Sequence, residues 1–308
     1  MGRRRHGVPV HGWLVIDKPA GVTSAAVVAA VRRATHAAKV GHGGTLDPLA
    51  TGVLPIALGE ATKTVSYVMD GSKNYRFTIR WGEQRNTDDA EGDVVNVSDV
   101  RPTEDAIRAV LPRFVGEIDQ VPPIFSAVKV AGQRAYALAR AEMPVELESR
   151  TVRVEGIELI DMPDADHAVF EVIAGKGTYM RALARDLAVA LGTVGHVAAL
   201  RRNSVGPFTE SAAIPLDKID SLGHSDGLKE HLLPVGAALD GIPALHLTEA
   251  EGRRLQRGQP VAVLPVASRS SIKHLSRDAV FCAMAMGRPV ALATVKGGEI
   301  RPLRVLNL

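Results

Sequence analysis

One aspartate, Asp47, lies in a glycine-rich stretch whose residue types could do chemistry. The stretch GHGGTLDPLATG covers residues 41–52 and holds four glycines together with His42 and Asp47. Pro48 follows the aspartate and restricts it to an extended or turn conformation, which keeps Asp47 out of a helix. The glycines can take positive φ and let another chain approach closely. We expect a displayed carboxylate; the alternative is an Asp-Pro turn in which Asp47 bonds its own backbone.

The surrounding residues narrow the chemistry that this carboxylate could perform. His42 could be a metal ligand, a general base or a hydrogen-bond donor to a substrate. A metal site needs three or four converging ligands, and His42 with Asp47 supplies only two, so no metal is predicted. The stretch has no Gly-Lys-Ser/Thr phosphate loop, no GxGxxG in a strand-loop-helix context and no GxSxG nucleophile elbow. The residues therefore favour a carboxylate nucleophile or base that needs no cofactor.

Two tyrosines are candidates for holding a substrate. Tyr75 and Tyr179 are two of only four tyrosines, and each has basic neighbours in the sequence. A tyrosine by itself is typical of a core position with a wetted hydroxyl. Beside a positive groove, an aromatic face is also the surface on which an unstacked base lies.

Composition limits the class of protein. The chain has 308 residues, 46% of them hydrophobic, which is enough for a sizeable core and favours two unequal domains. The net charge is +3, but the isoelectric point near 9.1 and local arginine clusters point to a polyanionic partner such as nucleic acid. Cys282 is the single cysteine, which excludes an intramolecular disulfide and fits a reducing cytoplasm. No apolar run approaches the roughly 18 residues that span a bilayer, so we expect no membrane association.

The elements around the glycine-rich stretch can be predicted from local signals. The chain is expected to open with a short basic arm before the first strand. Four elements should follow: a strand over 12–19 ended by Pro19, a helix over 25–37 capped by Thr23 or Ser24, a buried strand over 53–59 and a short helix over 60–70. Residues 74–82 alternate, which predicts a half-buried strand with Tyr75, Phe77, Ile79 and Trp81 on one face.

The helix that begins at Thr178 has the best defined pattern. Its apolar stripe is Met180, Leu183, Leu187 and Leu191, and Gly192 supplies a C-terminal stop. Arg181 and Arg185 lie one turn apart and should flank the core face. Residues 198–208 then read as a strand on which Arg201 and Arg202 point to opposite sides.

The remaining segments complete an α+β fold. We expect a helix over 101–116 capped by Thr103, a strand, a turn at Gly132 and a helix within 122–141, and strands over 151–160 and 168–175. The pattern weakens between 210 and 245, where we expect the domain boundary. Beyond it, Thr248 and Glu251 form a capping box and Gly258 ends the helix. Short strands are expected over 261–267, 279–286, 289–297 and 300–308. The prediction is a largely antiparallel mixed sheet flanked by helices in residues 1–238, and a small β-rich domain in 239–308.

Five ordered blocks resemble the TruB family of bacterial tRNA pseudouridine-55 synthases. They are residues 12–24, 41–63, 74–82, 175–192 and 200–208. The resemblance covers the first two-thirds of the chain, and the block over 41–63 is highly specific. The C-terminal piece is similar to the small PUA-like RNA-binding domain of this family. Phe125 departs from the family, which commonly has tyrosine at that place.

The resemblance implies an activity and a substrate. The family isomerises one uridine, at position 55 in the T loop of tRNA, by breaking the C1'–N1 bond and remaking a glycosidic bond through C5. It uses no cofactor. The base must be flipped out of its stack before a carboxylate can reach it. By resemblance Asp47 is the nucleophile, and it attacks either C1' of the ribose or C6 of the uracil.

The resemblance also assigns roles to other residues. Tyr75 packs on the target ring, and its hydroxyl could move a proton. Arg181 pairs with the catalytic carboxylate and fixes its rotamer. His42 contacts the RNA around the flipped base, and Tyr179 and Leu200 line the substrate pocket. Structural support for the loop falls to Lys18, Pro19 and Gly44.

The expected partner is the T stem-loop of tRNA. We expect a cytoplasmic monomer that needs neither a guide RNA nor an obligatory protein, although relatives in archaea and eukaryotes work inside guide-RNA particles. The alternative function is a non-catalytic tRNA-binding protein or RNA chaperone that uses the same surface.

Overall fold

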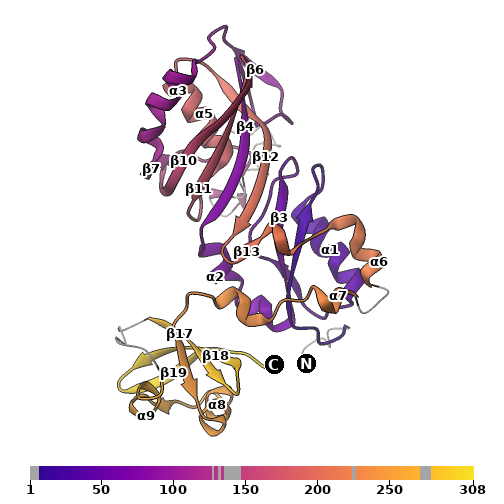
Figure 1. Cartoon of the computed structure of the whole chain (residues 1–308), viewed down its shortest axis with the longest axis vertical. Coiled ribbons are helices and arrows are strands. Elements are labelled where there is room, and N and C mark those ends of the chain that lie inside the picture. Colours follow the sequence, from indigo (N-terminus) through magenta and orange to yellow (C-terminus); the bar gives the residue numbers. More distant parts are fainter. Residues whose placement is uncertain (1–6, 127, 131–132, 135–146, 224–226, 271–278) are drawn as a thin grey trace.

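The fold is built on two β-sheets, which lie in different parts of the molecule (Figure 1). The computed structural model describes residues 7–126, 128–130, 133–134, 147–223, 227–270 and 279–308. The larger sheet has ten strands and the smaller has five. Within the described ranges, no helix is both long enough and apolar enough to cross a bilayer.

The ten-stranded sheet is mixed but mainly antiparallel. Its order is β14 (Ala213–Pro215), β1 (Gly12–Lys18), β3 (Thr51–Leu58), β12 (Gly195–Val205), β4 (Lys73–Trp81), β11 (His167–Ala174), β10 (Arg150–Asp164) and β7 (Gly116–Gln120). Two short strands extend it: β2 (Val40–His42) pairs with β3, and β13 (Phe208–Thr209) pairs with β12. Only the β1–β14 and β3–β12 pairs are parallel among these. The predicted α+β class and the largely antiparallel sheet are confirmed.

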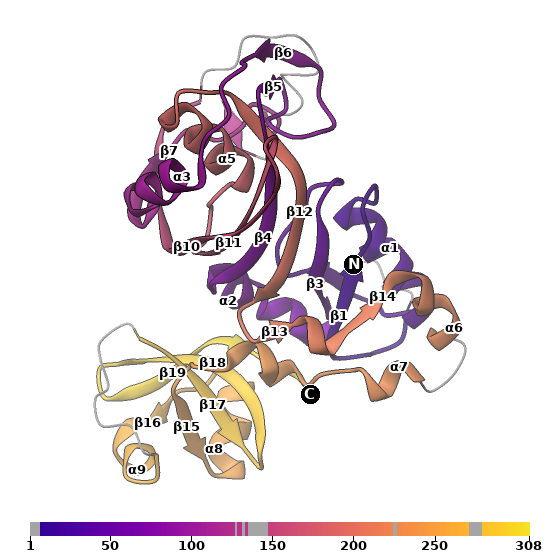
Figure 2. The same cartoon turned by 45° about the horizontal axis from the view of Figure 1, so that its top comes forward.

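The parallel contact between β3 and β12 joins the two halves of the large sheet (Figure 2). It consists of two residue pairs, Thr51 with Arg201 and Gly52 with Arg202. Gly52 has φ +99°, and a Cβ built there would lie 2.3 Å from the carbonyl oxygen of Arg202. Only glycine fits such a close backbone approach. The last glycine of the GHGGTLDPLATG stretch therefore lets the two halves meet.

The helices begin where the caps predicted them. The Thr23 hydroxyl accepts from the Ala26 N–H at 3.1 Å and caps α1 (Ser24–Thr35), so the alternative cap, Ser24, was wrong. The Thr103 hydroxyl caps α3 (Glu104–Val110), which a 3₁₀ turn over Leu111–Phe114 follows. The helix expected over 60–70 is divided into a 3₁₀ turn over Gly59–Lys63 and α2 (Val65–Asp70).

The best predicted helix, α5 (Met180–Ala190), packs on the large sheet. Its stripe residues Met180, Leu183 and Leu187 are buried in the main core. The backbone leaves the helix through Gly192 at φ +72°, the left-handed stop that the sequence predicted. Two further short helices, α6 (Ile219–Gly223) and α7 (Gly227–Glu230), lie near α1 (Figure 1).

The core of the large sheet confirms the period-2 pattern of β4. Phe77, Ile79 and Trp81 are all at most 1% exposed. Phe77 stacks on Phe170 of β11 at a ring separation of 5.4 Å. Burying each such side chain contributes about 2 kcal/mol, so this face holds β4 firmly against its neighbours.

The segment 122–141 is described only in part. The hairpin strands β8 (Lys129–Val130) and β9 (Gln133–Arg134) pair with each other, as do β5 (Glu83–Arg85) and β6 (Val94–Val97). The turn predicted at Gly132 and the helix predicted after it lie outside the described residues. The first six residues, with the arginines of the expected basic arm, also lie outside them.

The five-stranded sheet forms the C-terminal part. Its order is β15 (Ala244–Leu247), β17 (Val280–Ala285), β18 (Arg288–Lys296), β19 (Glu299–Val305) and β16 (Val261–Ala262). Helix α8 (Glu249–Gln256) starts with the predicted capping box of Thr248 and Glu251. This sheet packs directly on the larger part, because Leu292 and Leu306 share a core cluster with Trp13 and Val15.

The strand predicted over 261–267 was wrong beyond Ala262. Residues Val263–Ala267 form helix α9. Val263 and Val266 are buried while Leu264 is 81% exposed, and a spacing of three residues shares a face in a helix but not in a strand. Pro265 is tolerated because it lies in the first turn.

Candidate active site

A cavity of about 330 Å³ opens where the two halves of the large sheet meet. Its volume is in the range of small-ligand sites. It is lined by residues from the glycine-rich loop, β4, β12, α5 and the loop before α5: Gly44, Thr45, Leu46, Asp47, Met69, Lys73, Tyr75, Ser126, Gly175, Lys176, Gly177, Thr178, Tyr179, Met180, Arg181, Leu200 and Arg202. The structure thus brings together Asp47, Tyr75, Arg181, Tyr179, Leu200 and Gly44, which the sequence analysis had singled out.

Asp47 is displayed by a loop that is pinned on both sides. Before it, the Ser24 hydroxyl donates to the Leu46 carbonyl at 3.0 Å and accepts from the Leu46 N–H at 2.9 Å. After it, the Pro48 carbonyl accepts from the Gly21 N–H at 2.8 Å. The alternative prediction, a local turn at Asp47, is also present. Its hydrogen bond joins backbone groups, because the Ala50 N–H donates to the carbonyl of Asp47 and not to its side chain. The Asp47 carboxylate, 36% exposed, therefore remains available to the cavity.

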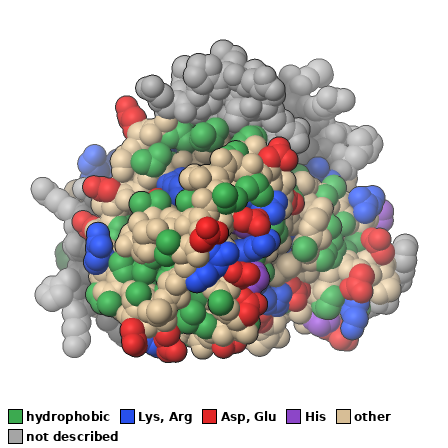
Figure 3. Space-filling view, turned by 90° about the horizontal axis from the view of Figure 1, so that it is seen from above, with side chains coloured by type: hydrophobic (Ala, Val, Ile, Leu, Met, Phe, Trp, Pro, Cys, Tyr) green, Lys and Arg blue, Asp and Glu red, His purple; other side chains and the backbone are tan. Residues whose placement is uncertain are grey.

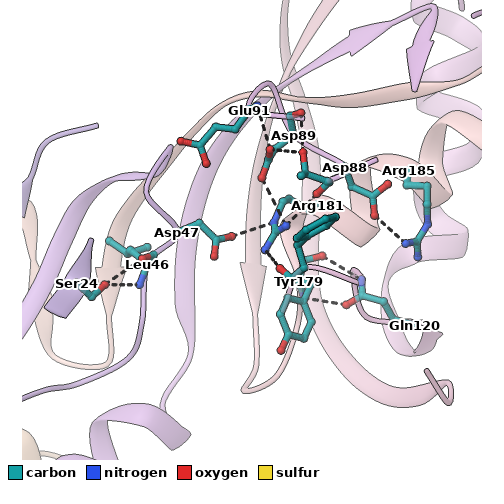
Figure 4. Close-up of polar contacts among 12 residues, drawn as sticks. Ser24, Leu46, Asp47, Asp88, Asp89, Glu91, Gln120, Tyr179, Arg181 and Arg185 are labelled. Carbon is teal, nitrogen blue, oxygen red and sulfur yellow. Dashed lines mark hydrogen bonds and ion pairs between the residues drawn. The ribbon is translucent and has the colours of Figure 1, made fainter. Parts of the chain in front are cut away.

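Arg181 orients this carboxylate. Its Nε donates to Asp47 Oδ2 at 2.9 Å, and Nη1 and Nη2 donate to the carbonyls of Thr87 and Phe125, each at 2.9 Å (Figure 4). Nη1 also lies 3.5 Å from Asp89 Oδ2. Because Arg181 is only 5% exposed, these contacts fix the plane of the guanidinium, and the guanidinium fixes Asp47. Phe125 takes part through its backbone, so the side-chain departure from the family leaves this contact intact.

The turn over 87–91 backs the arginines of α5. The Arg185 guanidinium donates to Asp88 Oδ2 at 2.9 Å. Burial raises the pKa of Asp88, and Arg185 opposes that shift. Asp88 has φ +60°, an uncommon conformation for a residue with a Cβ. Asp89, 4% exposed, accepts from the Thr87 hydroxyl and the Glu91 N–H. Sequence analysis missed this turn, although its run of acidic residues was a visible signal.

Tyr179 is held at the N-terminus of α5 by a buried amide. Gln120, 2% exposed, accepts from the Tyr179 N–H at 2.8 Å and donates to the Tyr179 carbonyl at 3.2 Å. The N-cap residue of α5 makes no side-chain hydrogen bond to the helix. Gln120, at the end of β7, instead supplies an acceptor for the backbone N–H at this end of the helix. The sequence carried no signal for Gln120.

Arg202 is a buried side chain that hydrogen-bonds the backbone of the glycine-rich loop. It is 1% exposed, and its guanidinium donates to the carbonyls of Val53 at 2.8 Å and Gly44 at 3.1 Å. Arg201 points the other way and pairs with Asp17 at the surface, which confirms the predicted opposite faces. Gly44 has φ +123°, a conformation that favours glycine.

His42 is not among the residues that line the cavity. It lies on β2, and burial together with the nearby Arg202 lowers the pKa of its ring. The imidazole is therefore neutral at pH 7.

Lys18 lies beneath the loop. Its ammonium donates to three carbonyls, of Pro19 at 2.9 Å, Val22 at 2.7 Å and Pro48 at 3.1 Å. Three donors thus meet three acceptors. Burial lowers the pKa of Lys18 to about 8, and the negative charge of Asp47 opposes the shift.

The cavity is cationic, whereas the face seen in Figure 3 carries both charges. Four cations line it, Lys73, Lys176, Arg181 and Arg202, against the single carboxylate of Asp47. The outer face in Figure 3 instead mixes Lys and Arg with Asp and Glu side chains. Across the described part of the chain, no three His, Cys, Asp or Glu side chains converge as a metal site. The lining therefore suits an anionic, aromatic ligand such as a nucleotide.

The chain belongs to the TruB family of pseudouridylate synthases. The family model described as TruB family pseudouridylate synthase (N terminal domain) matches residues 32–180, and that of the tRNA pseudouridylate synthase B C-terminal domain matches residues 181–240. Two curated proteins called tRNA pseudouridine synthase B are close relatives. The protein of Rhodospirillum rubrum is 59% identical over 308 residues and covers all of both chains. That of Caulobacter vibrioides is 51% identical over 309 residues, again with full coverage of both.

Two solved structures share the fold along the whole chain. A chain from a Cbf5-Nop10-Gar1 complex is 28% identical with a TM-score of 0.76, and the match covers 100% of this chain and 91% of that one. A chain from an H/ACA RNP bound to a substrate RNA containing 2'-deoxyuridine is 25% identical with a TM-score of 0.74, and covers 100% and 92%. The predicted family and fold are confirmed.

Proposed function

We propose that the chain isomerises a uridine of tRNA to pseudouridine at position 55 of the T loop, with Asp47 as the nucleophile. Relatives along the full length carry the name tRNA pseudouridine synthase B, which supports the enzyme class and the substrate. The observation that carries the site assignment is the Asp47 carboxylate, which opens into the cavity and is bound by Arg181 Nε at 2.9 Å.

The chemistry needs a uridine that has left its stack. A nucleotide in a folded loop exposes neither C1' nor C6 to a carboxylate within a cavity, so the base is flipped into the cavity. Tyr75 offers its ring to the flipped base, which offsets part of the lost stacking. Asp47 attacks C1' or C6, and the C1'–N1 bond breaks. C1' bonds to C5, and the bond to Asp47 breaks, which regenerates the carboxylate. C5 then loses its hydrogen as a proton and N1 gains one, so the reaction needs no outside reagent.

The remaining contacts bind the RNA. Lys73 and Lys176 on the cavity lining suit the phosphates beside the flipped nucleotide. Tyr179, Leu200 and His42 keep their proposed contacts with the substrate. Because phosphate contacts release counterions, the affinity for tRNA should fall steeply as salt rises.

We also infer how the chain works. It acts as a monomer, in the cytoplasm, without a guide RNA or an obligatory protein. The name tRNA pseudouridine synthase B, which its relatives carry, supports an enzyme that acts on tRNA. The proposed division is a catalytic domain over 1–238 and a PUA-like RNA-binding domain over 239–308. The start of the second sheet at β15 (Ala244–Leu247) supports this boundary.

The test is incubation with unmodified tRNA, followed by mapping of pseudouridine at single-nucleotide resolution. Wild type should modify position 55 alone among the T-loop uridines. Asp47→Asn should bind tRNA and lose more than about a thousandfold in rate. Asp17→Asn is the matched control, because Asp17 is a similarly exposed carboxylate, paired with Arg201 outside the cavity lining. It should keep wild-type activity.

Two results would contradict the proposal. Modification at another nucleotide would exclude the assigned substrate position, and substantial activity in Asp47→Asn would exclude Asp47 as the nucleophile. A chain that bound and refolded tRNA without forming any pseudouridine would instead be the non-catalytic binding protein.

A further inference from the structure

Ser126 carries a hydroxyl that has no partner in the described part of the molecule. Few buried side-chain polar atoms there lack a hydrogen bond: Trp13 Nε1, His42 Nδ1, Trp81 Nε1, Arg85 Nε, Ser126 Oγ and Thr294 Oγ1. Of these, only Ser126 belongs to a residue that lines the Asp47 cavity. A buried hydroxyl without a partner costs free energy, and native structures rarely keep one without a reason.

The position of Ser126 is tied to the catalytic pair. Ser126 is 5% exposed, and its N–H donates to the Ile124 carbonyl at 3.0 Å. The preceding residue, Phe125, accepts from Arg181 Nη2 at 2.9 Å, and Arg181 holds Asp47. The backbone at Ser126 therefore lies at a fixed place relative to the Asp47–Arg181 pair, beside the cavity.

We propose that the Ser126 hydroxyl hydrogen-bonds the flipped uridine in the cavity, an inference that rests on the proposed function. A serine hydroxyl can donate one hydrogen bond and accept two. Uridine offers matching groups at O2, O4, N3–H and the ribose 2'-hydroxyl. The bond forms only when the nucleotide is present, so Ser126 is a substrate-binding residue whose hydroxyl has no partner among the described residues of the free enzyme.

The first test is Ser126→Ala, with Ser211→Ala as the control because Ser211 is exposed and outside the cavity lining. Ser126→Ala should lower kcat/KM about tenfold. Its melting temperature should equal or exceed that of wild type, because the free enzyme loses only an unpaired polar atom. A serine with a merely structural role would show the opposite pattern, with a lower melting temperature and unchanged kcat/KM, and that result would overturn the proposal.

The second test measures RNA binding in the Asp47→Asn background, where no reaction intervenes. Stem-loop RNAs of the T arm carry uridine, 2-thiouridine, 4-thiouridine, 3-methyluridine or 2'-deoxyuridine at the target position. Adding Ser126→Ala should weaken binding of the uridine RNA, and the loss should vanish for the one analogue that lacks the bonded group. An equal loss on all five RNAs, or no loss, would overturn the proposal.

The two tests separate this inference from the proposed function. If wild type forms no pseudouridine, the activity assignment fails, yet the binding series still decides whether Ser126 contacts the target nucleotide. If wild type is active and Ser126→Ala behaves as wild type in both tests, only the Ser126 proposal fails.

Discussion

Arg181 and Asp47 are 134 residues apart in the sequence, and Nε of the first donates to Oδ2 of the second at 2.9 Å. The two ends of this pair differ in burial, with side chains 5% and 36% exposed. The arginine is the fixed member because carbonyls of Thr87 and Phe125 and the carboxylate of Asp89 occupy its other side. The proposed nucleophile is thus positioned by a cation that belongs to the core.

Two substitutions of Arg181 should separate the effect of its positive charge from the effect of its hydrogen-bond geometry. Arg181→Lys keeps the charge but loses the planar fork, so kcat should fall about a hundredfold. Arg181→Met leaves the buried Asp89 without a cation and should cost about 3–5 kcal/mol of unfolding free energy as well. Single-turnover rates and urea denaturation measure the two effects. Wild-type kcat in Arg181→Lys would show that the fork does not orient Asp47.

Thr23 and Ser24 are neighbours with different roles. Thr23→Ala removes the cap of α1 and should cost about 1 kcal/mol of stability with little change in kcat. Ser24→Ala removes the only described side-chain partner of the Leu46 N–H and carbonyl. It should cost about 2 kcal/mol and lower kcat about tenfold, because the loop that holds Asp47 loosens. Equal effects of the two variants on kcat would contradict this division.

Gln120 should affect catalysis from the far side of α5. Gln120→Leu deprives the Tyr179 N–H of its partner and leaves the Tyr179 carbonyl with the Leu183 N–H as its donor. It should cost about 2 kcal/mol of stability. Gln120→Glu is the matched variant: it still accepts from the N–H but, when ionised, cannot donate to the carbonyl. We expect KM for tRNA to rise in the order wild type, Gln120→Glu, Gln120→Leu. An unchanged KM in Gln120→Leu would mean that Tyr179 needs no such anchor.

Lys73 predicts a pH dependence of stability. Its burial, at 7% exposed, lowers its pKa from 10.5 to about 8. Between these values the unfolded chain binds more protons than the folded one, so the free energy of unfolding rises with pH. From pH 7.5 to 9.5, the free energy of unfolding of wild type should therefore rise by about 2 kcal/mol relative to that of Lys73→Met. Urea denaturation at the two pH values measures this change. Lys18 also has a lowered pKa, but its contribution to the pH dependence is the same in both proteins and drops out of the comparison. A constant difference would show that Lys73 titrates normally.

Local signals determined much of the scaffold. Pro48 and the flanking glycines kept Asp47 in a loop because they act on their own backbone angles. Thr103 marked a helix start for the same local reason. The period of β4 (Lys73–Trp81) identified its buried face before any partner was known. At Val263–Ala267 the local pattern predicted a strand, and this prediction was wrong because the segment buries one face of a helix.

Family resemblance supplied the pairing of Asp47 with Arg181 and gathered Tyr75, Tyr179 and Leu200 in advance, but it did not supply their surroundings. Gln120, Ser126 and the turn that contains Asp89 reach the site from other segments. Their contacts depend on the register of β7 and on where α5 crosses the sheet, and such non-local geometry leaves no mark on the spacing of residues along the chain. The sequence by itself therefore determined which residue could be the nucleophile and how its loop is shaped. Only the tertiary structure decided what holds that residue in place, because those partners meet through packing between distant segments.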